Sequence, residues 1–189
     1  MRIVGGNMRG RNITAPRGRN TRPTSDQARE SVFNILAHAD YAPALDGAIV
    51  ADIFAGSGAL GLEAISRGAA FCLFVETAPE ARAAIRENVD TMGLGGVTRL
   101  HRRDATKLRI EPNNLRGSFT HVFIDPPYGK NLGQPVLQKL IEQKLLAPGA
   151  AVMYEMGNDE PDPVIAGFEI FDVRNWGKAK VVFMGHTQD

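Results

Sequence analysis

From about residue 48 onward the sequence alternates between short apolar runs and longer amphipathic segments, and this alternation constrains the fold more than any other feature. The apolar runs predict strands, because branched and aromatic residues gather in blocks of about four to eight. The predicted strands are 48–56, 71–76, 97–104, 120–127 and 151–156, and the predicted helices are 59–68, 78–93 and 134–146. Strands that alternate with helices predict an α/β fold with a doubly wound, mostly parallel sheet.

Both ends of the chain depart from this alternation. Residues 168–185 contain two apolar runs around a tight Asn-Trp-Gly connection, which predicts an antiparallel pair at the edge of the sheet. Residues 1–16 predict a β-hairpin, and residues 17–23 predict a basic loop. We therefore expect a small N-terminal extension over residues 1–23 and a main domain over residues 24–189.

The main domain is expected to open with a helix that begins at Thr24. Thr24 and Gln27 have the spacing of a capping box, in which each side chain bonds a backbone N–H at the start of the helix. An apolar stripe with helical spacing follows: Ala28, Val32, Ile35, Leu36 and Ala39. This stripe predicts that one face of the helix packs on the body of the protein.

Composition excludes several classes of protein. The 189 residues are 43% hydrophobic and 23% charged, as in an ordinary globular protein, and no apolar run approaches the roughly 18 residues that span a bilayer. The start, MRIVGGNMRGR, lacks the apolar core of a signal peptide. The single cysteine, Cys72, has no partner for an internal disulfide, and the four histidines are too scattered to predict a metal site. We expect a cytoplasmic monomer without a metal.

Charge is concentrated near the N-terminus. Residues 1–38 hold seven arginines and two acidic residues, a balance of +5 in a chain whose net charge is +1. Such asymmetry is typical of a nucleic-acid-binding arm, although a solvated surface loop is the alternative. Arginine binds phosphate in a bidentate manner and stacks on bases. The predicted RNA-binding residues are Arg9, Arg11, Arg17, Arg19 and Arg22.

A glycine-rich loop follows the first predicted strand of the alternating region. Gly56, Gly58 and Gly61 fit the pattern G-x-G-x-x-G, and a helix is expected directly behind them. Glycines at such a position let the backbone approach a ligand closely. The loop therefore predicts a cofactor site, with Phe54, Ala55, Gly56, Ser57, Gly58 and Gly61 as candidate contacts.

Four successive strands end with a carboxylate: Asp52, Glu76, Asp104 and Asp125. The carboxyl ends of parallel strands meet at one rim, where ligands bind in such sheets. Asp52 would suit an ammonium group, Glu76 both hydroxyls of a ribose, and Asp104 the exocyclic amine of an adenine; Thr77 and Ala105 adjoin the last two. Each acid alone is more often a solvated strand end, but together they predict a pocket for a nucleoside that carries a cation, such as S-adenosylmethionine.

The sequence HVFIDPPYGK, residues 121–130, predicts the reactive corner. Asp125 and the carbonyl of Pro126 could accept the two N–H bonds of an exocyclic amine on a nucleobase and hold its nitrogen toward a methyl donor. Pro126 and Pro127 stiffen the turn because each fixes φ. Tyr128 could stack on a base that is flipped out or already unpaired.

These segments, together with RPTSDQARESVFN (residues 22–34), resemble the RsmD family of bacterial methyltransferases, which modify guanine N2 in 16S ribosomal RNA. The resemblance implies a Rossmann-like class I methyltransferase fold with seven strands and an N-terminal β-hairpin extension. It also implies transfer from S-adenosylmethionine to a guanine in 16S rRNA, on an assembled or nearly assembled small ribosomal subunit. Arg22, Thr24 and Arg29 lie in the narrow family segment and could close over the cofactor or target base, or serve the structure alone.

The residues leave alternatives open. A methyltransferase of adenine N6 in DNA or RNA would need the same two acceptors. A methyltransferase of protein glutamine more often carries NPPY and would not explain the arginines. A nicotinamide-dependent oxidoreductase would use the glycine loop but leave DPPY without a role. A non-catalytic RNA-binding assembly factor with a vestigial pocket is disfavoured because the set of strand-end acids is complete.

Overall fold

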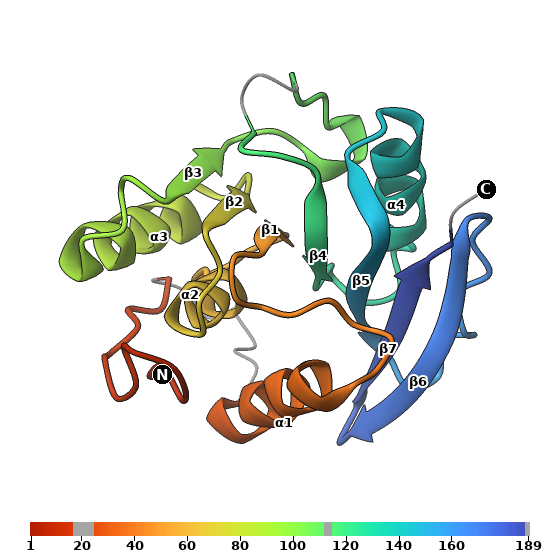
Figure 1. The fold of residues 1–189 in the computed structure, drawn as a ribbon, viewed down its shortest axis with the longest axis horizontal. Coiled ribbons are helices and arrows are strands. Elements are labelled where there is room, and N and C mark those ends of the chain that lie inside the picture. Colours follow the sequence, from red (N-terminus) through yellow and green to blue (C-terminus); the bar gives the residue numbers. More distant parts are fainter. Residues whose placement is uncertain (17–24, 112–114, 188–189) are drawn as a thin grey trace.

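The computed structural model describes residues 1–16, 25–111 and 115–187, and its centre is a seven-stranded sheet in the order β3-β2-β1-β4-β5-β7-β6 (Figure 1). The strands are β1 (Ile49–Ile53), β2 (Phe71–Val75), β3 (Thr98–His101), β4 (Phe119–Ile124), β5 (Leu146–Gly157), β6 (Phe168–Trp176) and β7 (Ala179–His186). The helices are α1 (Asp26–His38), α2 (Ala59–Ser66), α3 (Pro79–Met92) and α4 (Gly133–Glu142), with a 3₁₀ turn, η1, at Ala105–Lys107. The predicted α/β fold is confirmed.

The sheet is mostly parallel, and its antiparallel part lies at one edge, as predicted. Strands β3, β2, β1, β4 and β5 pair in parallel, whereas β7 pairs antiparallel with both β5 and the edge strand β6. The connection from β6 to β7 is a two-residue turn at Gly177 and Lys178, because Asn175 and Trp176 still pair with β7. The predicted Asn-Trp-Gly connection was therefore placed too early in the chain. The strand order reverses between β1 and β4, which is where such sheets bind ligands.

Helices cover both faces of the sheet (Figure 1). Helices α1, α2 and α3 contribute to a hydrophobic cluster on one face, and α4 and η1 contribute to a second cluster on the other. In β1, Val50 belongs to the first cluster, while Ala51 and Ile53 belong to the second. Strands covered on both faces are apolar at successive positions, which explains the continuous apolar runs of the sequence.

The N-terminal residues form a minimal hairpin. One antiparallel bridge joins Arg2 to Asn12, and the N–H of Ile3 donates to the carbonyl of Arg11 at 2.8 Å. Ile3 and Ile13 are buried in the same cluster as the side chains of α1 and α2. The described part of the extension is thus packed on the main domain, while the domain boundary at residue 23 stays a prediction.

A buried carboxylate on α2 holds this hairpin in place. The side chain of Glu63 has no exposed surface and accepts the backbone N–H groups of Val4 at 2.9 Å and Gly5 at 2.7 Å. The same carboxylate forms an ion pair with Arg67 at 2.8 Å and lies 3.6 Å from the guanidinium of Arg29. Because these donors come from three different segments, Glu63 ties the extension, α1 and α2 together.

Helix α1 begins at Asp26, and its N-cap is Ser25, whose hydroxyl accepts the N–H of Ala28 at 3.1 Å. The predicted start and capping box at Thr24 are therefore wrong, and Thr24 itself lies outside the described residues. The buried face also differs from the predicted stripe, since it consists of Arg29, Val32, Phe33 and Leu36. Arg29 occupies a core position because Asp26 and Glu63 supply charge partners.

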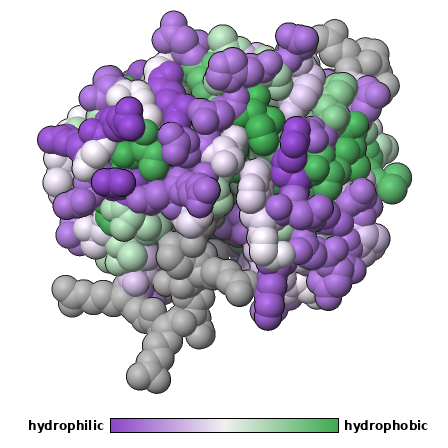
Figure 2. All heavy atoms as spheres, turned by 90° about the horizontal axis from the view of Figure 1, so that it is seen from below, coloured by the Kyte–Doolittle hydropathy of each residue, from purple (hydrophilic) through white to green (hydrophobic). Residues whose placement is uncertain are grey.

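The face of the molecule on the side of α1, which Figure 2 shows, is mainly polar. Figure 2 shows hydrophilic side chains that separate several small hydrophobic patches on the face seen from below. In the described ranges, the exposed large hydrophobic residues are Val164, Ile170 and Phe171. Within the same ranges, the helices are too short or too polar to cross a membrane.

Candidate active site

A cavity of about 790 Å³ lies at the carboxyl ends of the parallel strands, beside the point where the strand order reverses. Its walls bring together residues that are far apart in the sequence. The predicted site residues that line it are Phe54, Glu76, Thr77, Asp104, Ala105, Asp125, Pro126, Pro127 and Tyr128. The size falls within the range of about 300–1,000 Å³ that is usual for small-molecule sites.

Glu76 lies just after β2, where its carboxylate organises the rim of the cavity. One oxygen accepts the N–H of Gly56 at 2.8 Å, and the other accepts the N–H groups of Thr77 at 2.8 Å and Ala78 at 2.9 Å. A carboxylate offers about four acceptor positions, so Glu76 can hold the glycine loop and still accept from a ligand hydroxyl.

Asp104 follows β3 on the same wall. Its side chain accepts the N–H of Thr106 at 2.9 Å and the hydroxyl of Thr106 at 2.7 Å, which caps η1. These bonds from Thr106 lower the pKa of the carboxyl, so it is an anion at neutral pH. An anionic acceptor at this rim can bind an amine donor, as the sequence predicts.

Asp52 does not line the cavity. Its side chain is 1% exposed, points from β1 toward α2 and accepts the N–H of Gly61 at 2.9 Å. The N-cap of α2 is Gly58, which has no side chain to cap the helix. Asp52 on β1 takes over this role, because it accepts the N–H of Gly61, which belongs to the first turn of α2. The pKa of Asp52 is raised to about 7, mainly by burial; the bond from Gly61 acts against this shift and the charge of Glu76 adds to it. Its predicted contact with an ammonium group stays a prediction.

The three glycines of the loop have different structural roles. Gly56 and Gly58 have φ values of 56° and 78°, in the left-handed region that favours glycine. Gly61 is needed for close packing, because a Cβ there would lie 2.4 Å from the ring of Phe74 and 2.5 Å from the sulfur of Cys72. Gly61 therefore seats α2 on β2 and does not itself face the cavity.

Of the remaining loop residues, Phe54 is part of the cavity wall, whereas Ala55 and Ser57 are not. Phe54 lines the cavity and has a φ of 61°, which is rare for an aromatic residue and marks a tightly held backbone. The carbonyl of Ser57 accepts the side-chain amide of Asn88 at 3.1 Å, and Ala55 donates its N–H to Val75 at 3.1 Å. Ala55 and Ser57 thus fix the loop to β2 and α3.

The DPPY turn lies at the end of β4 with its side chains on the cavity. Pro126 is buried, Pro127 is exposed, and Asp125 and Tyr128 are half-buried. Burial, followed by the charges of Glu155 and Asp52, raises the pKa of Asp125 well above its ordinary value. Because neighbouring carboxylates disfavour its charged form, the Asp125 carboxylate would be stabilised by positive charge or N–H donors in the cavity.

Glu155 is a site residue that the strand-end reasoning missed. It lies near the end of β5, is 8% exposed, lines the cavity and accepts a hydrogen bond from the hydroxyl of Tyr128. The rule that revealed the other acids applies to it as well, since an acid follows the apolar run AVMY in the sequence. Arg103, which also lines the cavity, is a second residue that the sequence reasoning did not name.

The predicted RNA-binding arginines are only partly covered by the structure. Arg9 and Arg11 are exposed on the hairpin, whereas Arg17, Arg19 and Arg22 lie outside the described residues. Arg29 is fully buried against Asp26 and does not reach the cavity wall. Among the described residues, no group of His, Cys, Asp and Glu side chains has the arrangement of a metal site.

Known proteins resemble this chain over nearly its whole length. Residues 1–185 match the family described as "Conserved hypothetical protein 95". The Ribosomal RNA small subunit methyltransferase D of Escherichia coli K12 is 34% identical over 157 residues, 82% of this chain and 74% of that protein. The protein of the same name in Haemophilus influenzae is 31% identical over 163 residues, 85% of this chain and 81% of that protein.

Solved structures share the architecture. The yhhF protein of Escherichia coli superposes with a TM-score of 0.81 at 28% identity, covering 99% of this chain and 98% of that one. An RNA methyltransferase from Salinibacter ruber, in complex with S-adenosyl-L-homocysteine, has a TM-score of 0.62 at 19% identity over 89% and 95% of the two chains, a likeness of fold alone. The family match over residues 1–185 and the curated relatives above 30% identity show that the chain belongs to the RsmD family of ribosomal RNA methyltransferases.

Proposed function

We propose that this protein transfers a methyl group from S-adenosylmethionine to the exocyclic N2 amine of one guanine in 16S ribosomal RNA. One observation carries the proposal. The DPPY turn, with Asp125 at its head, opens into the same cavity as the nucleoside-type acceptors Glu76 and Asp104. A methyl donor and an amine acceptor can therefore meet at one place.

The chemistry of the cavity wall fits S-adenosylmethionine better than a dinucleotide. Its carboxylates are Glu76, Asp104, Asp125 and Glu155, and the basic residue among the described lining is Arg103. An excess of carboxylates favours a ligand with cationic groups and hydroxyl or amine donors, and it repels a pyrophosphate. We assign the ribose hydroxyls to Glu76 and the adenine amine to Asp104. When bound, S-adenosylmethionine supplies a reactive methyl group on a positively charged sulfur.

The DPPY turn then positions the acceptor. The Asp125 carboxylate and the Pro126 carbonyl accept the N–H bonds of the amine and keep its nitrogen pointed toward the methyl group. Positive charge develops on that nitrogen during transfer, and a fixed carboxylate beside it lowers the energy of the transition state. Pro126 is buried and its ring fixes φ, and both restrain the turn as the charge develops.

The RNA substrate is supported by the relatives and by charge. The curated relatives are named as methyltransferases of small-subunit ribosomal RNA. In this chain the basic N-terminal region places Arg9 and Arg11 on the surface, where they can contact phosphates. We assign the target to 16S rRNA in the small subunit or a late assembly intermediate.

The test is a map of methylation in ribosomal RNA. Small subunits from cells that lack this protein are incubated with the purified protein and S-adenosylmethionine, and the 16S rRNA is digested and analysed by mass spectrometry. We expect one N2-methylguanosine to be absent before incubation and present afterwards. The appearance of N6-methyladenosine instead, or of no methylated nucleoside, would contradict the proposal.

A variant tests the role of the DPPY turn. Asp125→Asn keeps the shape of the side chain but removes its charge, so we expect methyl transfer to fall by at least about a hundredfold. Binding of S-adenosylhomocysteine, measured by calorimetry, should change far less. Asp90→Asn, the same substitution at an exposed position of α3, is the matched control and should behave as the wild type.

A further inference from the structure

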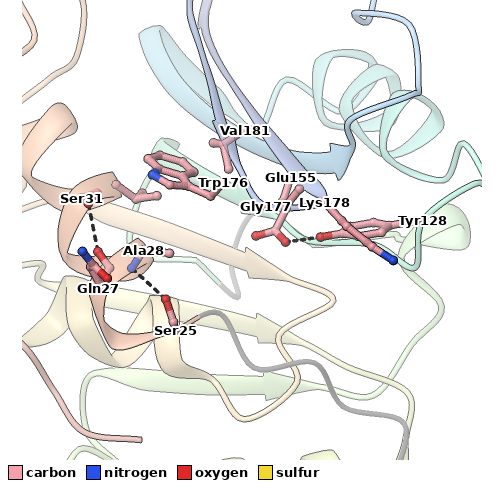
Figure 3. Close-up of a pocket in the computed structure, with 12 residues that line it drawn as sticks. Ser25, Gln27, Ala28, Ser31, Tyr128, Glu155, Trp176, Gly177, Lys178 and Val181 are labelled. Carbon is pink, nitrogen blue, oxygen red and sulfur yellow. Dashed lines mark hydrogen bonds between the residues drawn. The ribbon is translucent and has the colours of Figure 1, made fainter.

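A second cavity adjoins the first. It has a volume of about 510 Å³ and lies between α1 and the turn that joins β6 to β7. Its walls include Gln27 of α1, Trp176 at the end of β6 and Lys178 of the turn. Tyr128 and Glu155 line both cavities, so the two spaces meet at this pair. Figure 3 shows Glu155 between the rings of Trp176 and Tyr128.

Glu155 stands next to Asp125 across the sheet. Ile124 of β4 pairs with Tyr154 of β5, so the residues that follow them, Asp125 and Glu155, leave adjacent parallel strands at the same level. After burial, the charge of Glu155 is the next cause of the raised pKa of Asp125, as expected for neighbouring carboxylates. A ligand that enters from the second cavity therefore meets two neighbouring carboxylates.

Two adjacent carboxylates suit the edge of guanine and not that of adenine. Guanine presents the N1–H directly beside its N2 amine, so two donors adjoin on this edge, with the O6 acceptor beyond them. Adenine carries a lone pair at N1 beside its N6 amine, and a carboxylate opposite that lone pair would repel it. Enzymes that act on an extruded base recognise it through this edge. A site built to accept a particular N–H strongly rejects an analogue that lacks it.

We propose that Glu155 selects guanine as the target base, by accepting its N1–H while Asp125 holds its N2 amine. This inference rests on the proposed function and names the residue that decides the base. The hydroxyl of Tyr128 donates to Glu155 and helps to orient the carboxylate, a group that offers about four acceptor positions in all. The base enters through the second cavity, where Trp176 offers an aromatic wall and Lys178 a cation for the RNA backbone.

The decisive probe is 2-aminopurine riboside, which keeps the 2-amine but has a lone pair at N1 in place of the N1–H. Because it also lacks O6, a comparison with the variant Glu155→Gln isolates the contact at N1. Small subunits are reconstituted with 16S rRNA in which this nucleoside replaces the mapped target guanosine. We expect wild-type protein to methylate guanosine with a kcat/KM at least about tenfold higher, since a hydrogen bond to a charged group is lost with the analogue. Wild-type protein that methylates both substrates equally well would overturn the inference.

The variant Glu155→Gln sharpens the test, because an amide can donate to the N1 lone pair of 2-aminopurine. The ratio of kcat/KM for guanosine to kcat/KM for 2-aminopurine riboside should fall at least about tenfold in this variant. The control Glu169→Gln, at an exposed position on β6, should leave this ratio unchanged. Quenching of 2-aminopurine riboside fluorescence should report tighter binding to Glu155→Gln than to the wild type. An unchanged preference in Glu155→Gln would overturn the role of Glu155, while a wild type that does not methylate guanosine at all would instead contradict the proposed function.

Discussion

Removal of the buried carboxylate of Glu63 should destabilise the protein strongly. In Glu63→Ala the N–H groups of Val4 and Gly5 lose their acceptor, and the guanidinium of Arg29, which has no exposed surface, loses a charge partner 3.6 Å away. Breaking a buried ion pair by removing one partner costs about 3–5 kcal/mol. A domain of this size loses about 2–4 °C of melting temperature per kcal/mol. We therefore expect the melting temperature to fall by about 6–20 °C.

Circular dichroism during thermal and urea unfolding measures this effect, and hydrogen exchange locates it. Exchange of the backbone amides in residues 1–16 should rise more than exchange in the central strands, because the hairpin loses its anchor. Glu87→Ala is the matched control, since this exposed residue on α3 accepts one bond, from the hydroxyl of Thr14 at 3.1 Å, and should cost less than about 0.5 kcal/mol. Equal stability of the two variants, or unchanged exchange in the hairpin, would refute the reasoning.

Three further outcomes are expected. Asp52 has a pKa of about 7 in the folded protein and an ordinary value of 3.8 when unfolded, so its contribution to stability falls as pH rises from about 4 to 7 and is constant above. In urea titrations, Asp52→Asn should therefore lose less unfolding free energy than the wild type between pH 5 and pH 8. Equal losses in the two proteins would contradict the raised pKa of the buried carboxyl. Glu76→Gln should weaken S-adenosylmethionine binding about tenfold or more in calorimetry. The glutamine amide has one oxygen and one NH2 group, so it cannot accept on both sides from the N–H groups that surround Glu76. An unaltered dissociation constant would count against the assignment of the ribose to Glu76. Replacing Arg9 and Arg11 by alanine should reduce RNA affinity and flatten its dependence on salt, and an identical salt slope would show that the two arginines do not contact phosphates.

The parts of the fold that follow from local patterns could be predicted from the sequence. Apolar runs bounded by glycines and prolines located the central strands, because strands that are covered on both faces have little polar sequence. The rule that ligands gather at the carboxyl ends of parallel strands brought Glu76, Asp104 and Asp125 to one cavity.

Other features depend on the direction of a side chain or on distant segments, and local patterns do not contain that information. Asp52 precedes the last residue of β1, and the alternation of the strand turns it under α2, away from the rim. Arg29 looks like a surface residue of an amphipathic helix and is buried only because Glu63 of another helix lies beside it. Trp176 was expected in a turn, and its place in a cavity wall depends on the packing of α1 against the distant β6–β7 turn.

The pair formed by Tyr128 and Glu155 belongs to the walls of two cavities, and this has a consequence for inhibitor design. A compound that joins an adenosine-like group to a purine could occupy both spaces through a short linker, and binding of one half would raise the effective concentration of the other. A substitution of Tyr128 or Glu155 that weakened the binding of such a compound would alter both cavities together. Resistance through this shared wall would therefore carry a cost in enzyme activity.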